Sequence, residues 1–186
     1  DSFYGKAIVG TVSGTSISFG SAVEFGGNTY TDIPIRAVFD SSNNKVVVVY
    51  QDANNSNYGT ARVGTVSGTS ISFGSAVVFE SASVGNTVSA AFDSTNNKVV
   101  IAYSDSGNSS YGTAIVGTVS GTSISFGSPT VFESDAITFS SAAFDSTNDK
   151  VIIAYRDTGN SDYGTAVVGT VSGTSISFGS PTVFES

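Results

Sequence analysis

The sequence predicts an all-β protein made of tandem repeats, and two observations lead to this prediction. First, the twelve residues GTVSGTSISFGS occur four times without a change, beginning at Gly10, Gly64, Gly117 and Gly169. Second, the residues around these copies alternate polar with apolar or form short apolar runs bounded by turn residues, a pattern typical of strands. No segment predicts a helix. Because self-similarity at a fixed period is the signature of repeat architectures, the repeat decides the fold class.

The repeat accounts for the whole chain of 186 residues. A Tyr-Gly pair precedes each copy, at Tyr4, Tyr58, Tyr111 and Tyr163, with spacings of 54, 53 and 52 residues. We therefore expect a single repeat domain with no separate linker. Its predicted parts are an incomplete unit at 1–25 and three complete units at 26–79, 80–132 and 133–186.

The sequence of each complete unit predicts two β-hairpins. In the first hairpin, TAIVGTV (113–119) leads through a tight turn into SISF (123–126) and TVF (130–132). In the second, AAF (142–144) leads through the turn DSTNDK into VIIAY (151–155), which is apolar without alternation and is therefore expected to be buried on both faces. Asp145 and Asn148 suit this turn, because short polar side chains bond the local backbone and Asn tolerates left-handed angles.

Four short antiparallel strands in about fifty residues match the blade of a β-propeller. A β-solenoid is the alternative. Its coils need only about 20 to 30 residues per repeat, so a period above fifty with two distinct hairpins favours the blade.

The order AAFDSTNDKVIIAYRD followed by TAIVGTVSGTSISFGSP resembles the sialidase-type propeller blade with its Asp-box hairpin. The Asp of that box is absent, since 120–123 read SGTS, and Phe126 stands where Trp is usual. The repeat is also similar to uncharacterised propellers encoded by marine viruses. Sialidase chemistry does not carry over, because Arg36, Arg62 and Arg156 lie at unrelated places in the repeat and form no arginine triad.

The resemblance implies a strand order in which AAF is innermost, VIIAY second, TAIVGTV third and SISF to TVF outermost. The chain then reads as one orphan outer hairpin followed by three blades. Propellers usually close with at least four blades, so sheet faces would be exposed at both ends. We therefore expect self-association, with a homodimer completing the ring.

All length variation between units falls in one link, 26–36, 80–89 and 133–141, which runs 11, 10 and 9 residues. In the propeller arrangement this link emerges on the same face as the loop between the second and third strands. Variable loops on a rigid scaffold usually carry binding, so this longer-loop face is the candidate binding face. The candidate binding residues are Asp52, Tyr58, Asp105, Asn108, Tyr111, Asp157, Asn160, Asp162 and Tyr163.

Each of these candidates also has a structural interpretation. Asp157, Asn160 and Asp162 offer oxygen ligands to calcium, but turn capping explains them as well and no metal site is assigned. The tyrosines could stack on sugar rings or bury their rings between blades. We expect Asp40, Asp93 and Asp145 to cap hairpin turns. The phenylalanines that we expect in the core are Phe19, Phe25, Phe73, Phe79, Phe126, Phe132, Phe178 and Phe184.

The composition excludes several classes of partner and of catalytic site. A net charge of −8 and a pI near 4.1 argue against nucleic acid as a partner. The lack of Cys and His excludes disulfides, Cys/His zinc sites and Ser-His or Cys-His catalytic pairs. No apolar run predicts a membrane helix, and the absence of Met leads us to expect a processed piece of a larger protein.

Two function classes follow from the sequence. The first is a non-enzymatic structural or adhesion module, part of a larger extracellular or virion-surface protein. The second is a glycan-binding propeller that uses the longer-loop face, in which repetition of sites would add avidity. The predicted partners are therefore a second copy of the chain and carbohydrate, with calcium as the one cofactor to test.

Overall fold

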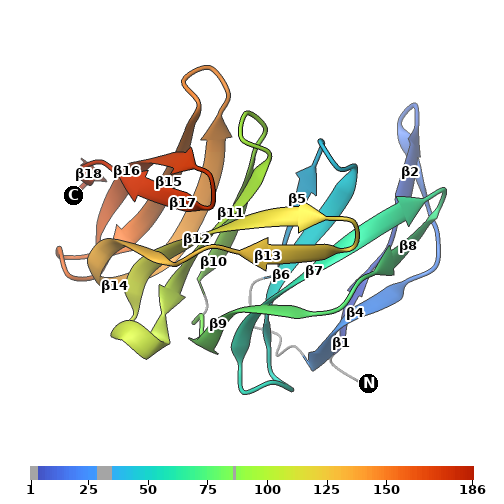
Figure 1. The fold of residues 1–186 in the computed structure, drawn as a ribbon, viewed down its shortest axis with the longest axis horizontal. Helices are drawn as coiled ribbons and strands as arrows, with labels where there is room; N and C mark the ends of the chain where they lie inside the picture. The colour runs from blue at the N-terminus through green and yellow to red at the C-terminus, as the bar shows by residue number, and fades with distance from the viewer. Residues whose placement is uncertain (1–3, 29–34, 86) are drawn as a thin grey trace.

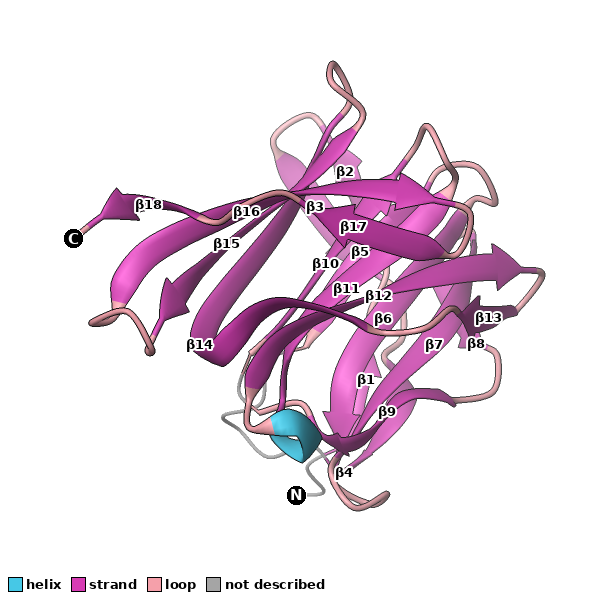
Figure 2. Cartoon of the chain, turned by 60° about the vertical axis from the view of Figure 1, so that its left-hand side comes forward, coloured by secondary structure: helices cyan, strands magenta, loops and turns pink. Residues whose placement is uncertain are grey.

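The computed structural model describes residues 4–28, 35–85 and 87–186. In this part of the chain the fold is all-β with antiparallel strand pairs, as the sequence predicts. One 3₁₀ turn, Ser106–Asn108, is the single helical element among the described residues, and the sequence pattern did not predict it (Figure 2).

Each complete unit is a four-stranded antiparallel sheet in the predicted strand order. The first contains β5 (Arg36–Asp40), β6 (Lys45–Asp52), β7 (Tyr58–Ser67) and an outer strand in two pieces, β8 (Ser70–Phe73) and β9 (Val77–Ser83). The second contains β10 (Val88–Asp93), β11 (Lys98–Asp105), β12 (Tyr111–Ser120), β13 (Ser123–Phe126) and the first part of β14 (Thr130–Asp145). The third contains the rest of β14, β15 (Lys150–Asp157), β16 (Tyr163–Ser172), β17 (Ser175–Phe178) and β18 (Thr182–Glu185).

The incomplete unit consists of the third and fourth strand positions. β1 (Tyr4–Ala7) pairs with β4 (Val23–Asn28), and β2 (Gly10–Ser13) pairs with β3 (Ser16–Phe19). The predicted beginning of this hairpin at 1–3 and most of the link 26–36 lie outside the described residues.

The link 133–141 is not a loop, contrary to the sequence prediction. It lies inside β14, a strand of sixteen residues whose first part pairs with β12 and whose second part pairs with β15. The register shifts between Thr138 and Ser141, which lets one strand leave one unit and enter the next. The second and third units therefore form one nine-stranded sheet.

The units follow one another along the long axis of the molecule, and the two ends of the chain lie at opposite ends of the series (Figure 1). Within the described residues this is an open series rather than a closed ring. Strand β11 is buried on both faces from Val99 to Ser104, as its continuous apolar run predicts. Strand β15 alternates instead, because one face of the last unit has no neighbouring sheet.

Aromatic rings join each unit to the next at the outer strands. The ring centroids of Phe79 and Phe126 lie 5.8 Å apart, and those of Phe79 and Tyr103 lie 5.3 Å apart with an edge-on orientation. The same triplet recurs at the other two junctions, formed by Phe25, Phe73 and Tyr50 and by Phe132, Phe178 and Tyr155. Such geometry adds to the free energy gained from burying the rings.

A glycine after each SISF strand lets the backbone of the next unit approach. A Cβ at Gly74 would lie 1.9 Å from the carbonyl oxygen of Thr122, far inside contact distance. Gly20 and Gly127 stand in the same relation to Thr69 and Thr174. Any side chain at these positions would push neighbouring sheets apart.

Two of the eight phenylalanines predicted in the core are exposed. Phe19 is 61% and Phe184 is 64% exposed, whereas Phe132, which occupies the same repeat position as Phe184, is 7% exposed. Each exposed ring lies at an end of the series, where the neighbouring unit that would cover it is missing. The repeat position alone was therefore not enough to predict burial.

The inner hairpin turns confirm the predicted role of the three aspartates that open them. Asp93 Oδ1 accepts from the N–H groups of Thr95 and Asn96, and its Oδ2 accepts from the Asn96 amide. Asp40 and Asp145 make the same set of bonds in their turns. The left-handed residue of the turn is Asn97 and its equivalents Asn44 and Asp149, one position later than the sequence suggested.

We predict that Gly74→Ala lowers the free energy of unfolding by at least about 2 kcal/mol, because the new methyl group overlaps a backbone carbonyl that cannot rotate away. Gly179→Ala is the matched control at a protein concentration that keeps the chain monomeric, since the nearest atom to a Cβ there within one chain is Val168 O at 3.9 Å. Urea denaturation of both variants measures the difference. Equal stability of the two variants would contradict this account of the junction.

Candidate functional site

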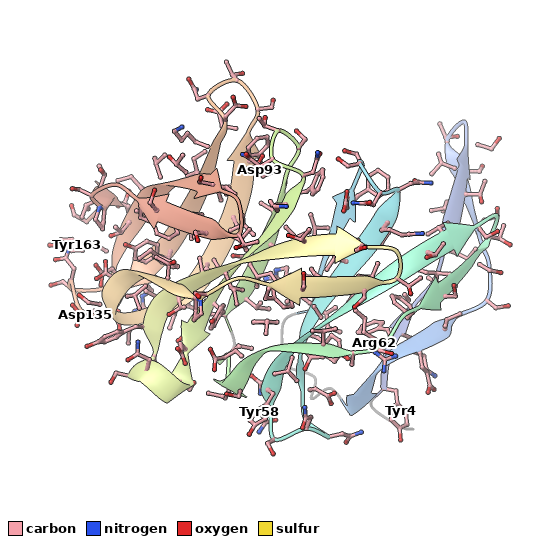
Figure 3. All side chains as sticks on the ribbon, in the orientation of Figure 1. Tyr4, Tyr58, Arg62, Asp93, Asp135 and Tyr163 are labelled. Carbon is pink, nitrogen blue, oxygen red and sulfur yellow. The ribbon has the colours of Figure 1, made fainter. Side chains whose placement is uncertain are left out.

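The inner hairpin turns and the longer loops lie at opposite ends of the strands. Asp93 in an inner hairpin turn lies at the top of the view and Tyr58, which follows the longer loop of the first unit, lies at the bottom, while Tyr163 and Asp135 of the last unit lie at the left (Figure 3). A cavity described below is lined by residues of both loop kinds, so the links and the loops after the second strands share one face. The sequence predicted this arrangement.

The recurring aspartates on this face cap the loops in which they lie. Asp52 Oδ1 accepts from the N–H of Asn54, and Asp105 Oδ1 accepts from the N–H of Gly107. Asp157 Oδ1 accepts from Gly159 and Asn160. The turn-capping interpretation therefore accounts for one oxygen of each carboxylate.

Asp157 and Asp162, two of the three residues whose oxygens the sequence offers to calcium, have different charged neighbours. Asp162 Oδ2 lies 2.7 Å from the Arg156 guanidinium in an ion pair. The acidic neighbours of Asp157 are instead Glu133 and Asp135, and one oxygen of each lies within 4.8 Å of the others. Asp157 is buried in this cluster, Glu133 is half-buried and Asp135 is exposed.

The candidate tyrosines Tyr58, Tyr111 and Tyr163 are half-buried at the first positions of their strands. The tyrosines buried between sheets are a different set, Tyr50, Tyr103 and Tyr155, which end the apolar run of each second strand. The sequence analysis did not include the hydroxyl groups of these three tyrosines among the candidate site groups. Their position at the end of VVVVY, VVIAY and VIIAY was the available signal, since a buried tyrosine needs a partner for its hydroxyl.

Two of these buried hydroxyls donate to glutamates on the outer strand of the preceding sheet. Tyr103 donates to Glu80 Oε2 at 3.0 Å, and Tyr155 donates to Glu133 Oε2 at 2.9 Å. Burial raises the pKa of both phenols, and the neighbouring carboxylates raise it further. Burial also raises the pKa of Glu80, with the Asp105 charge adding to it and the Tyr103 hydrogen bond opposing it.

A cavity of about 390 Å³ opens on the longer-loop face between the second and third units. Its lining carries hydroxyl groups and no charged side chain. The lining residues are Gly85, Thr87, Ser104, Ser106, Ser110, Ala136, Ile137, Thr138 and Phe139. None of them was a candidate from the sequence, although Ser106 and Ser110 adjoin the candidates Asp105 and Tyr111, and Gly85 and Thr87 fall in a variable link.

Phe139 stands out in this lining. Its side chain is 77% exposed, and its backbone has φ of +52°, which is costly for a bulky residue. The Oγ1 of Thr87 accepts a hydrogen bond from the Phe139 N–H at 3.2 Å and so helps to hold this conformation. Strained backbone conformations of this kind cluster at functional sites.

The chain was compared with protein-family models, curated proteins and solved structures, and none of them matches it. Within the described residues no helix has the length and apolar character needed to span a membrane.

We predict that Glu80→Gln makes the protein more stable than the wild type at neutral pH but not at acidic pH. The folded-state pKa of Glu80 is raised, so its contribution to stability is present below the unfolded value near 4.5 and is lost as the pH rises through the folded value. Glutamine keeps an oxygen that accepts from Tyr103 and carries no charge.

Urea denaturation of the wild type and the variant over a pH series tests this. Glu24→Gln, in an exposed ion pair with Lys6, serves as the control for loss of one negative charge. A stability difference that does not depend on pH would contradict the expected effect of burial.

Proposed function

We propose that this chain is a non-enzymatic module of the β-propeller type that assembles with further copies of itself. In this proposal the four-stranded units are the blades. Two observations support this interpretation: the strand order, with the inner hairpin followed by the outer one, and the face-to-face packing of successive sheets.

The observation that carries the proposal is the apolar surface at both ends of the series. At the amino-terminal end Ile17 is 54% exposed, whereas its equivalent Ile124 is 3% exposed. At the carboxyl-terminal end Val168 is 47% exposed, whereas its equivalent Val116 is fully buried. Contiguous apolar surface of this kind marks interaction sites.

Electrostatics opposes the same association. Each copy carries a net charge of −8, so copies repel one another at low ionic strength. Burial of large apolar side chains contributes about 1.5–3 kcal/mol for each one covered, and salt does not screen this term. Salt does screen the repulsion, so added salt should strengthen assembly.

We predict a solution mass that is a multiple of 18.8 kDa, rising with salt concentration. Light scattering on a size-exclusion column measures the mass at low and at moderate ionic strength over a range of protein concentrations. A monomer under all of these conditions would overturn the proposal.

Glycan binding is the second candidate function, and the cavity beside Phe139 favours it. Sugars are neutral and rich in hydroxyls, and the side chains of Thr87, Ser104, Ser106 and Ser110 can both donate to and accept from them. An exposed aromatic ring at such a cavity offers a stacking surface for the apolar face of a sugar ring. The lack of charged lining residues favours a neutral sugar over an anionic one.

We predict that Phe139→Ala abolishes the binding of neutral glycans on an array, with an affinity loss of at least tenfold, about 1.4 kcal/mol. Phe39→Ala is the matched control, because Phe39 is also an exposed phenylalanine but does not line the cavity. The array is probed with and without calcium, since the cluster of Glu133, Asp135 and Asp157 lies on the same face. No binding by the wild type in either condition would exclude this candidate.

A further inference from the structure

We infer that copies of this chain join head to tail, with the carboxyl-terminal face of one copy packed on the amino-terminal face of the next. The carboxyl-terminal face consists of Val168, Gly179 and Phe184. The amino-terminal face consists of Val12, Thr15, Ile17 and Phe19. The inference rests on the self-association proposed above and adds its polarity and its contacts.

The aromatic contacts between units leave one unused ring at each end. Inside the chain, the phenylalanine of each TVF-type strand packs on the SISF phenylalanine of the following unit, with centroids 5.5–5.8 Å apart. Phe184 is the last ring of the first kind and has no following unit. Phe19 is the first ring of the second kind and has no preceding unit. Each is therefore the partner that the other lacks.

The glycine contacts give the same pairing independently. Gly20, Gly74 and Gly127 each leave room for the carbonyl of the threonine in the next SGT turn. Gly179 is the fourth such glycine, and among the described residues no threonine carbonyl faces it. Thr15 is the first threonine of the series, and none of the described glycines packs against it. A head-to-tail contact would bring Gly179 to Thr15 and complete both series.

The chemistry of the two faces makes this pairing specific. Val12, Thr15, Ile17, Phe19 and Gly179 belong to GTVSGTSISFGS, which is identical in all four copies, so these parts of the two end faces match the corresponding parts of the internal junctions. Phe184 lies outside this motif but occupies the same place in PTVF as Phe132, which packs on Phe178. The three internal junctions therefore show the geometry that we expect for the contact between copies. Two carboxyl-terminal faces placed together would leave Gly179 without a threonine turn to receive.

The contact is complete only in its outer half. Among the described residues the incomplete unit has no inner strand pair, so Phe39 on β5 is 55% exposed, whereas its equivalents Phe92 and Phe144 pack into the core. The head-to-tail contact therefore covers Phe19 and leaves Phe39 at a step between copies.

Two variants that each disable one face test the polarity. Gly179→Ala with Phe184→Ser disables the carboxyl-terminal face, and Ile17→Ser with Phe19→Ser disables the amino-terminal face. Both variants should fold, because three of these side chains are more than half exposed and Gly179 has open space around it. Circular dichroism and urea denaturation check this. Val131→Ser is the control for an exposed apolar side chain on a unit with neighbours on both sides.

We expect each variant alone to associate at least about 30-fold more weakly than the wild type, with the control unchanged. An equal mixture should restore association as a one-to-one heterodimer of twice 18.8 kDa and no larger species, because one intact face remains on each variant. Native mass spectrometry distinguishes the heterodimer from homodimers by the mass of the substitutions.

Every other outcome overturns the inference. If either variant still dimerises by itself, like faces pair with like faces or the contact lies elsewhere. If the mixture stays monomeric while the wild type associates, one intact carboxyl-terminal face and one intact amino-terminal face do not pair, so the head-to-tail contact is wrong although self-association itself survives. If the wild type itself is monomeric, the proposed function fails together with the inference.

Discussion

The packing of one sheet on the next at the outer strands is the constraint on which the rest of this structure depends. A glycine without a side chain, a carbonyl of the next turn and three aromatic rings meet at each junction, and they meet in the same way three times. A single unit has two apolar faces and cannot bury either of them alone, as in other repeat proteins. The stability of each unit is therefore a property of its neighbours, and burial falls off toward both ends of the chain.

The same junctions position the polar chemistry. Because each TVF-type strand ends beside the next sheet, the glutamate after it reaches the tyrosine that ends the apolar run of that sheet, as Glu80 reaches Tyr103. The first junction has Gly26 at this position, and there the Tyr50 hydroxyl lies 3.4 Å from the Phe25 carbonyl oxygen instead. A few residues beyond these glutamates, on the longer-loop face, lie the strained backbone of Phe139 and the serine and threonine hydroxyls that line the cavity. Rigid junctions thus hold the segments that vary from unit to unit, which is the arrangement on which binding loops usually depend.

Most of the fold could be predicted from the sequence because the repeat states the same pattern four times. Strand order, the aspartate-capped turns and the face that carries the long loops all followed from spacing and residue type. Burial at the ends did not follow, because Phe19 and Phe184 have the same sequence context as their buried equivalents and differ only in lacking a neighbour. The cavity could not be predicted either. It depends on the left-handed backbone of Phe139, which lies at the register shift between Thr138 and Ser141, and no local sequence pattern indicates this shift. The Asp157 cluster joins residues from β14 and β15, and only the folded sheet shows that these come together.

Strand β14 has a consequence for how the molecule folds and unfolds. The first and second units are joined through a short connection that includes Gly85 in a left-handed conformation, and their two sheets share no strand. The second and third units share one uninterrupted strand, and fraying of one would remove hydrogen bonds from the other. Cooperative units in proteins follow such shared elements rather than sequence boundaries. We therefore expect the second and third units to unfold as one cooperative unit, with amide hydrogen exchange decaying at one common rate in both although the sequence period divides them.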